Sequence, residues 1–120
     1  MATILLIDDE DQVRMLFQIA LEDAGYRVVT ADSGQAGLRL LHEQVVDLML
    51  VDIIMPGMDG LELIQHLRKA RPASKILAIS GGSGASNYLG PAKYLGAHDT
   101  LKKPINLQEL LDVVAAQLQA

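Results

Sequence analysis

Four short runs of β-forming residues are each followed, at once or after one residue, by side chains that could do chemistry. These are three carboxylates, a hydroxyl and an ammonium group: Asp8, Asp9, Asp52, Ser80 and Lys103. Two carboxylates at about 4 Å repel by roughly 4 kcal/mol at an effective dielectric of 20. A pocket that holds such acids therefore needs counter-charge. Lys103 would supply part of it, and a hard divalent cation with oxygen ligands, Mg²⁺ by preference, would supply the rest.

This set of side chains suits phosphoryl transfer, which needs charge neutralisation and positioning more than covalent chemistry from the protein. A carboxylate can be the nucleophile and form an aspartyl phosphate, and Asp52 is the candidate. Lys103 and the Ser80 hydroxyl would hold phosphoryl oxygens. Gly81 has no side chain, so its backbone amide could approach the same oxygens.

Each of these residues also has an ordinary structural explanation. Asp8 and Asp9 precede a predicted helix, where acids often cap or stabilise the first turn. Taken singly, Asp52 would be an acid that opens a loop, Ser80 would be uninformative, and Lys103 before proline would belong to a solvated turn. The coincidence of all of them at the ends of strands favours the chemical interpretation.

The runs that carry these residues read as strands that alternate with helical patterns. The predicted strands are 3–7, 27–30, 47–51, 75–79 and 98–101. Helices are predicted from the acid cluster to Ala24 with Gly25 at the end, from Ser33 as N-cap to about Glu43, from 59–60 to Pro72, from about Asn87 to Leu95 with Pro91 in the first turn, and from Asn106 as N-cap. This alternation predicts an α/β fold, a doubly wound five-stranded parallel sheet with five helices. In such sheets the site lies outside the carboxyl ends of the strands.

Composition narrows the function classes. The 120 residues suggest one domain over 1–120, the net charge is −5 and no basic cluster is longer than KK at 102–103, which argues against nucleic-acid binding. No apolar run approaches the roughly 18 residues that span a bilayer, so no membrane partner is expected. There is no cysteine, and the N-terminal MATILLIDDE lacks the basic lead of a signal peptide. A cytoplasmic location is the default expectation.

Over essentially its whole length, the chain resembles the receiver domain of two-component response regulators. The matching segments are LLIDDE at 5–10, LMLVDIIMPGMDGLELI at 48–64, ILAISG at 76–81, GA at 96–97 and LKKP at 101–104. The resemblance implies a flavodoxin-like sheet with strand order 2-1-3-4-5. It also implies a phosphoacceptor signalling module, not an enzyme, that receives its phosphoryl group from a sensor histidine kinase or a phosphotransfer protein and controls an unknown downstream protein.

The resemblance also implies roles for single residues. Asp52 would accept the phosphoryl group, and Ser80, Lys103 and the Gly81 amide would contact it. Mg²⁺ would be bound directly by Asp9, Asp52 and the backbone carbonyl of Ile54, and through water by Asp8. The Lys103–Pro104 peptide is commonly cis in this family.

Three departures from the family pattern bear on output. Thr100 stands three residues before the site lysine, where an aromatic residue usually couples the site to its surface. The loop after Ser80 is rich in glycine, so we expect phosphorylation to shift the 81–95 loop and helix instead. Ile54 and Gly82 offer no polar side chain to position water, which predicts slow self-dephosphorylation.

Two other function classes stay open at this point. The first is a degenerate, phosphorylation-independent binding module with the receiver fold, which Thr100 keeps in view. The second is a magnesium-dependent hydrolase that forms an aspartyl phosphate. Such hydrolases normally carry a second acid two residues after the nucleophile, where this chain has Ile54, so this class is much less favoured.

Overall fold

The computed structural model describes residues 1–54, 60–81, 91–93 and 95–119, which form a sheet with helices on both faces. The strands are β1 (Thr3–Ile7), β2 (Arg27–Ala31), β3 (Leu48–Asp52), β4 (Lys75–Ser80) and β5 (Asp99–Lys102). The helices are α1 (Asp11–Asp23), α2 (Gly34–Glu43), α3 (Gly60–Ala70) and α5 (Leu107–Gln119). All five predicted strands are confirmed, each to within one residue at either end.

The sheet has the order β2-β1-β3-β4-β5, and every neighbouring pair is parallel. The predicted flavodoxin-like order is confirmed. It places β1 beside β3, with Ile7 opposite Val51. The chain segments that follow these two strands therefore leave the sheet next to each other, which brings the acids after β1 close to the end of β3.

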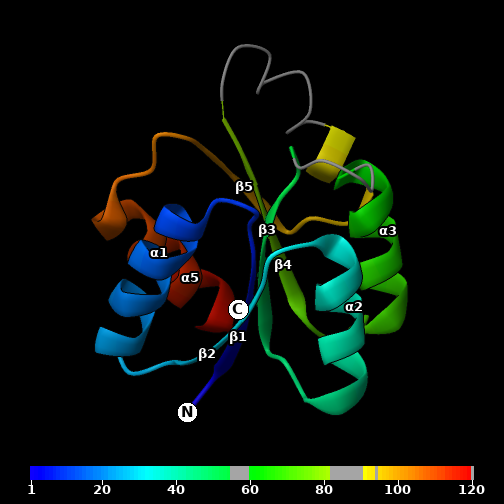
Figure 1. Ribbon diagram of the computed structural model, residues 1–120, viewed down its shortest axis with the longest axis horizontal. Coiled ribbons are helices and arrows are strands. Elements are labelled where there is room, and N and C mark those ends of the chain that lie inside the picture. Colours follow the sequence, from blue (N-terminus) through cyan, green and yellow to red (C-terminus); the bar gives the residue numbers. More distant parts are fainter. Residues whose placement is uncertain (55–59, 82–90, 94, 120) are drawn as a thin grey trace.

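Alternating side chains divide the core into two layers. Leu5 and Ile7 of β1 belong to a cluster with α2 and α3, whereas Ile4 and Leu6 belong to a cluster with α1 and α5. Figure 1 shows these helix pairs on opposite faces of the sheet. Because successive strand residues point to opposite faces, a strand that is apolar at every position can be covered on both sides.

Local capping chemistry sets several helix boundaries. Ser33 Oγ accepts a backbone N–H from the first turn of α2, and Asn106 Oδ1 accepts the N–H of Gln108 at 2.8 Å before α5. Gly25 follows the end of α1 with φ +99°, a conformation that glycine adopts at little steric cost. These predicted helix ends are confirmed.

The predicted fourth helix is described only in part. Residues 91–93 and 95 are helical, and Pro91 is the first of them. The predicted start at about Asn87 and the glycine-rich loop lie outside the described residues. Within the described ranges, no helix combines the length and apolarity that a membrane crossing requires.

Candidate functional site

Two buried carboxylates lie together at the carboxyl edge of the sheet. Asp52 is the last residue of β3, and Asp8 directly follows β1. Asp8 is buried, and only 3% of the surface of Asp52 is exposed. Burying an ionised carboxylate is costly unless it is paired and hydrogen-bonded. The pair therefore needs a cation and donors at this edge of the sheet.

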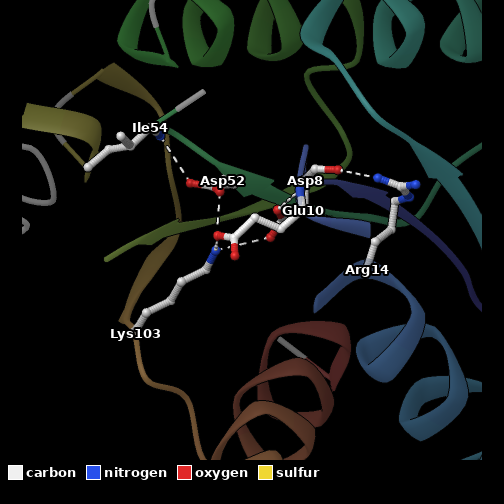
Figure 2. A network of polar contacts seen from close by, with 6 residues as sticks. All are labelled: Asp8, Glu10, Arg14, Asp52, Ile54 and Lys103. Atoms are coloured by element: carbon white, nitrogen blue, oxygen red, sulfur yellow. Dashed lines mark hydrogen bonds and ion pairs between the residues drawn. The ribbon is translucent and has the colours of Figure 1, made fainter. Parts of the chain in front are cut away.

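Lys103 supplies the cation from the segment after β5. Its Nζ lies 3.2 Å from each of three carboxylate oxygens, which belong to Asp8, Glu10 and Asp52 (Figure 2). An ammonium group has three N–H donors, so it can give one to each carboxylate. The acids of the β1–α1 loop and the end of β3 are thus joined through one side chain.

The end of β4 makes room for this lysine. The Ser80 carbonyl accepts the backbone N–H of Lys103 at 2.7 Å, which holds the lysine beside the strand. A Cβ built on Gly81 would lie 2.9 Å from the Cβ of Lys103, closer than side chains approach one another. The missing side chain at Gly81 therefore lets the stem of Lys103 pass β4 and reach the acids.

Burial and neighbouring charges shift the pKa values of Asp52 and Lys103. Burial raises the pKa of Asp52 above its ordinary value, although the Ile54 amide and Lys103 act to lower it, and the charge of Asp8 raises it further. Burial would lower the pKa of Lys103, but the charges of Asp52 and Asp8 outweigh burial and raise it above its ordinary value. Lys103 is therefore a cation at neutral pH.

Hydrogen bonds fix the β1–α1 loop and tie it to α1. Asp8 Oδ1 accepts the N–H of Glu10 at 2.9 Å, and the Asp8 carbonyl accepts from Arg14 Nη1 at 2.8 Å (Figure 2). Arg14 also pairs with Asp11 at 2.5 Å. Asp8 is thus fixed through both its side chain and its backbone, which leaves its Oδ2 directed at Lys103.

The structure brings most of the predicted site residues together, but not all in the predicted way. Asp8, Asp52 and Lys103 are in direct contact, and the Ile54 N–H donates to Asp52 Oδ1 at 3.0 Å. Asp9 is exposed and is not one of the acids that gather around Lys103 among the described residues. Its predicted metal contact stays a prediction.

Ser80 has a buried hydroxyl without a hydrogen-bond partner among the described residues. Ordinary buried polar groups are hydrogen-bonded, so an unpaired hydroxyl at a strand end is a free donor and acceptor beside the site. The predicted cis peptide between Lys103 and Pro104 is confirmed. Thr100 lies on β5 opposite Ala78 of β4 and is half-buried.

Two residues of the site escaped the sequence analysis. Glu10 contributes the third carboxylate, and Arg14 holds the Asp8 backbone. Glu10 belongs to the same DDED run as the predicted acids, so its charge was visible in the sequence. Which acid of that run faces Lys103 depends on how the loop turns after β1, and side-chain type does not determine that turn.

The acids form a donor set that fits a divalent cation. Asp8, Glu10 and Asp52 each offer a carboxylate oxygen, and these oxygens lie within 4.8 Å of one another. Hard oxygen ligands of this kind suit Mg²⁺, which is commonly held by one or two carboxylates together with phosphate oxygens and water.

A cavity of about 470 Å³ opens beside the acids. Glu10, Asp52, Gly81 and Lys103 form its polar part. Its apolar part comes from α1, from Ile54 and from the segment after Lys103: Val13, Leu16, Phe17, Ile54, Pro104 and Ile105. The cavity therefore lies against Asp52 and has a mainly apolar lining.

Comparison with protein families and solved structures is consistent with this geometry. The family model of the response regulator receiver domain matches residues 4–115. A solved CheY-like response regulator receiver domain protein from Methanospirillum hungatei superposes with a TM-score of 0.92 at 29% identity, covering 99% of this chain and 94% of that one.

Curated relatives are longer than this chain. The transcriptional regulatory protein AfsQ1 of Streptomyces coelicolor is 36% identical over 88% of this chain and 46% of its own length. The transcriptional regulatory protein CpxR of Escherichia coli is 35% identical over 99% of this chain and 50% of its own length. The sensor kinase CckA of Brucella abortus is 38% identical over 98% of this chain, which spans 13% of the kinase. The chain thus spans half or less of the length of these relatives.

Proposed function

The chain belongs to the response regulator receiver domain family, and from this premise we propose that Asp52 accepts a phosphoryl group from a sensor histidine kinase or a phosphotransfer protein. One observation carries the proposal: a buried strand-end carboxylate, Asp52, shares Lys103 with the buried acid Asp8. A paired ion group of this kind at the carboxyl edge of a parallel sheet is suited to a reaction that gathers negative charge. Residues 1–120 would form one such domain, with a cytoplasmic location.

The proposed reaction is a displacement at phosphorus. An Asp52 oxygen forms the new P–O bond, the P–N bond of the donor phosphohistidine breaks, and its electron pair stays on the imidazole nitrogen, which then takes up a proton. Lys103 and the Ser80 hydroxyl would hold phosphoryl oxygens, and the Gly81 amide would assist them. The unpaired Ser80 hydroxyl supports its role, because it has a hydrogen bond still to make.

The same proposal includes a magnesium ion. Asp9, Asp52 and the carbonyl of Ile54 would bind it directly, and Asp8 would bind through water. The chemistry that Mg²⁺ supplies when bound is neutralisation of the charge on the phosphoryl oxygens. The oxygen donors around Asp52 support the choice of metal.

Output would pass through the 81–95 segment to a downstream protein, as a shift between states that already exist. Thr100 supports this route over an aromatic switch, because a half-buried threonine on β5 offers no ring to move inward. Most of the segment lies outside the described residues. If amide exchange at 81–95 is the same with and without a phosphoryl mimic, this route is wrong.

The test of the acceptor is intact-mass measurement. Wild type and Asp52→Asn are incubated with Mg²⁺ and acetyl phosphate or phosphoramidate. We expect wild type to gain one phosphoryl group and keep it for longer than seconds, since Ile54 positions no water, and we expect the variant to gain none. Magnesium chelation should abolish the gain.

The other outcomes identify the alternatives. Turnover of the donor without a retained adduct would indicate an aspartyl-phosphate hydrolase. Absence of both adduct and turnover would indicate a binding module that works without phosphorylation. An adduct of equal size in Asp52→Asn would place the acceptor elsewhere.

A further inference from the structure

Lys103 has no spare donor in the unphosphorylated site. Its ammonium group contacts Asp8, Glu10 and Asp52, each at 3.2 Å. Three carboxylates are enough to use all three N–H groups of an ammonium. A phosphoryl oxygen that arrives on Asp52 can therefore gain a hydrogen bond from Lys103 only if one existing partner lets go.

Glu10 is the partner that can be released at least cost. The side chain of Asp8 is 1% exposed and that of Asp52 is 3% exposed, whereas that of Glu10 is 60% exposed. A buried carboxylate that loses its cation is left unpaired in a poor solvent for charge. An exposed one is simply hydrated, and exposed ion pairs contribute little.

The side chain of Glu10 binds Lys103 and does not cap the helix that it precedes. Glu10 is the N-cap residue of α1, yet its side chain makes no capping hydrogen bond. The side chain instead reaches Lys103, 93 positions away in the sequence. Glu10 also lines the cavity through which a donor would approach Asp52.

We propose that Glu10 is an exchangeable counter-ion of Lys103, which occupies the lysine until the phosphoryl group on Asp52 displaces it. This inference rests on the proposed phosphoacceptor function. Glu10 is then a positioning residue that acts through Lys103. It holds the ammonium group among the acids of the resting site and weakens the uptake of any anion that needs the same lysine.

The test is the apparent affinity for beryllofluoride, a phosphoryl mimic, in saturating Mg²⁺, followed by amide NMR shifts of the full chain. Glu10→Gln keeps the size of the side chain but removes its charge. We expect it to bind the mimic about threefold to tenfold more tightly than wild type, the size of a partly exposed ion pair. Glu10→Asp keeps the charge but shortens the reach, and should give a smaller gain of the same sign.

Asp11→Asn is the matched control, because it removes a neighbouring negative charge that pairs with Arg14 and not with Lys103. We expect this variant to stay within about twofold of wild type. An equal gain in Asp11→Asn would show a general charge effect and overturn the role of Glu10.

Magnesium affinity without the mimic separates displacement from metal binding. Because Glu10 is also one of the three acids whose oxygens could hold a cation, a loss of Mg²⁺ affinity of more than about fivefold in Glu10→Gln would make it a metal ligand and overturn the proposal. Uptake of the mimic by wild type without a gain in Glu10→Gln would overturn only the Glu10 inference. Failure of wild type to take up the mimic would overturn the phosphoacceptor function itself.

Discussion

At the scale of single residues, the buried charge of Asp52 should make the folded chain less stable. Its pKa is raised in the folded state, mainly by burial. As the pH rises above the ordinary value of about 3.9, the unfolded chain releases this proton first, so stability falls until the folded-state pKa is passed. Above that pH, folding carries the full cost of a buried charge.

Asp52→Asn should therefore raise the free energy of unfolding at pH 7 by about 0.5 to 2 kcal/mol, the range of single stabilising substitutions. Asparagine can still accept the Ile54 N–H, and Lys103 keeps Asp8 and Glu10 as partners. Urea denaturation from pH 4 to pH 8 measures the difference between variant and wild type. A gain that is independent of pH would contradict the assignment to ionisation.

Residue types and strand order were enough to predict that acids and a lysine gather at one edge of the sheet, because the carboxyl ends of parallel strands lie at the same edge. Asp8, Asp52 and Lys103 meet as predicted. Glu10 and Arg14 were not predicted, since their contacts depend on the path of the β1–α1 loop. Sequence spacing does not distinguish the acid that faces Lys103 from Asp9, its exposed neighbour.

At the scale of secondary structure, two glycines on the helices of one face should respond very differently to the same substitution. A Cβ on Gly60, the first residue of α3, would lie 2.0 Å from the backbone oxygen of Ile53, next to Asp52. A Cβ on Gly37 in α2 would lie 2.4 Å from Ile7 Cδ1, the end of a side chain that can rotate.

Gly60→Ala should lower the free energy of unfolding by more than about 2 kcal/mol, because backbone cannot move aside without shifting β3. Gly37→Ala is the matched control and should change it by less than about 1 kcal/mol, since alanine has the higher helix propensity. Both values come from urea denaturation. Equal losses would show that α3 can move away from the end of β3.

Helix ends were predictable where they depend only on a capping residue and its immediate neighbours. Ser33, Asn106 and Gly25 gave correct helix ends, because capping depends on the residue and its immediate neighbours. Several predicted strand ends differ by one residue from the observed ends. The last paired residue of a strand, such as Asp52 in β3, is decided by the length of the neighbouring strand.

At the scale of the whole molecule, the layer arrangement was predictable and the packing of the sheet edge was not. Strands that are apolar at every position require helices on both faces. Figure 1 shows helices on both faces, and a separate core cluster lies on each face of the sheet. One hydrogen bond that holds the edge strand β5 against β4 cannot be predicted from hydrophobic periodicity. His98, just before β5, accepts the Ile76 N–H of β4 on its ring Nδ1 at 3.0 Å.

The ring Nε2 of His98 also lies 3.3 Å from Arg68 Nη1 of α3, so the imidazole contacts α3 as well as β4. Burial lowers the pKa of His98, and the charges of Lys75 and Arg68 lower it further. A proton on Nδ1 would remove the bond to Ile76 and add a third positive charge. The folded state therefore binds this proton less readily than the unfolded state.

The contribution of His98 to stability should be complete above pH 6.5, the ordinary pKa, and should decrease as the pH falls toward the folded-state pKa. His98→Asn keeps an acceptor for the Ile76 N–H but cannot titrate. Between pH 7.5 and pH 5, wild type should lose less than about 1 kcal/mol relative to this variant, because a partly exposed charge is screened by solvent. Urea denaturation of both proteins measures the loss. Both proteins contain His42 and His66, so any contribution of these residues to the free energy of unfolding is the same in both and drops out of the difference. A stability advantage of wild type over the variant that stays constant, or that shrinks as the pH rises, would contradict the titration of His98 and show that it holds the β5 edge by packing alone.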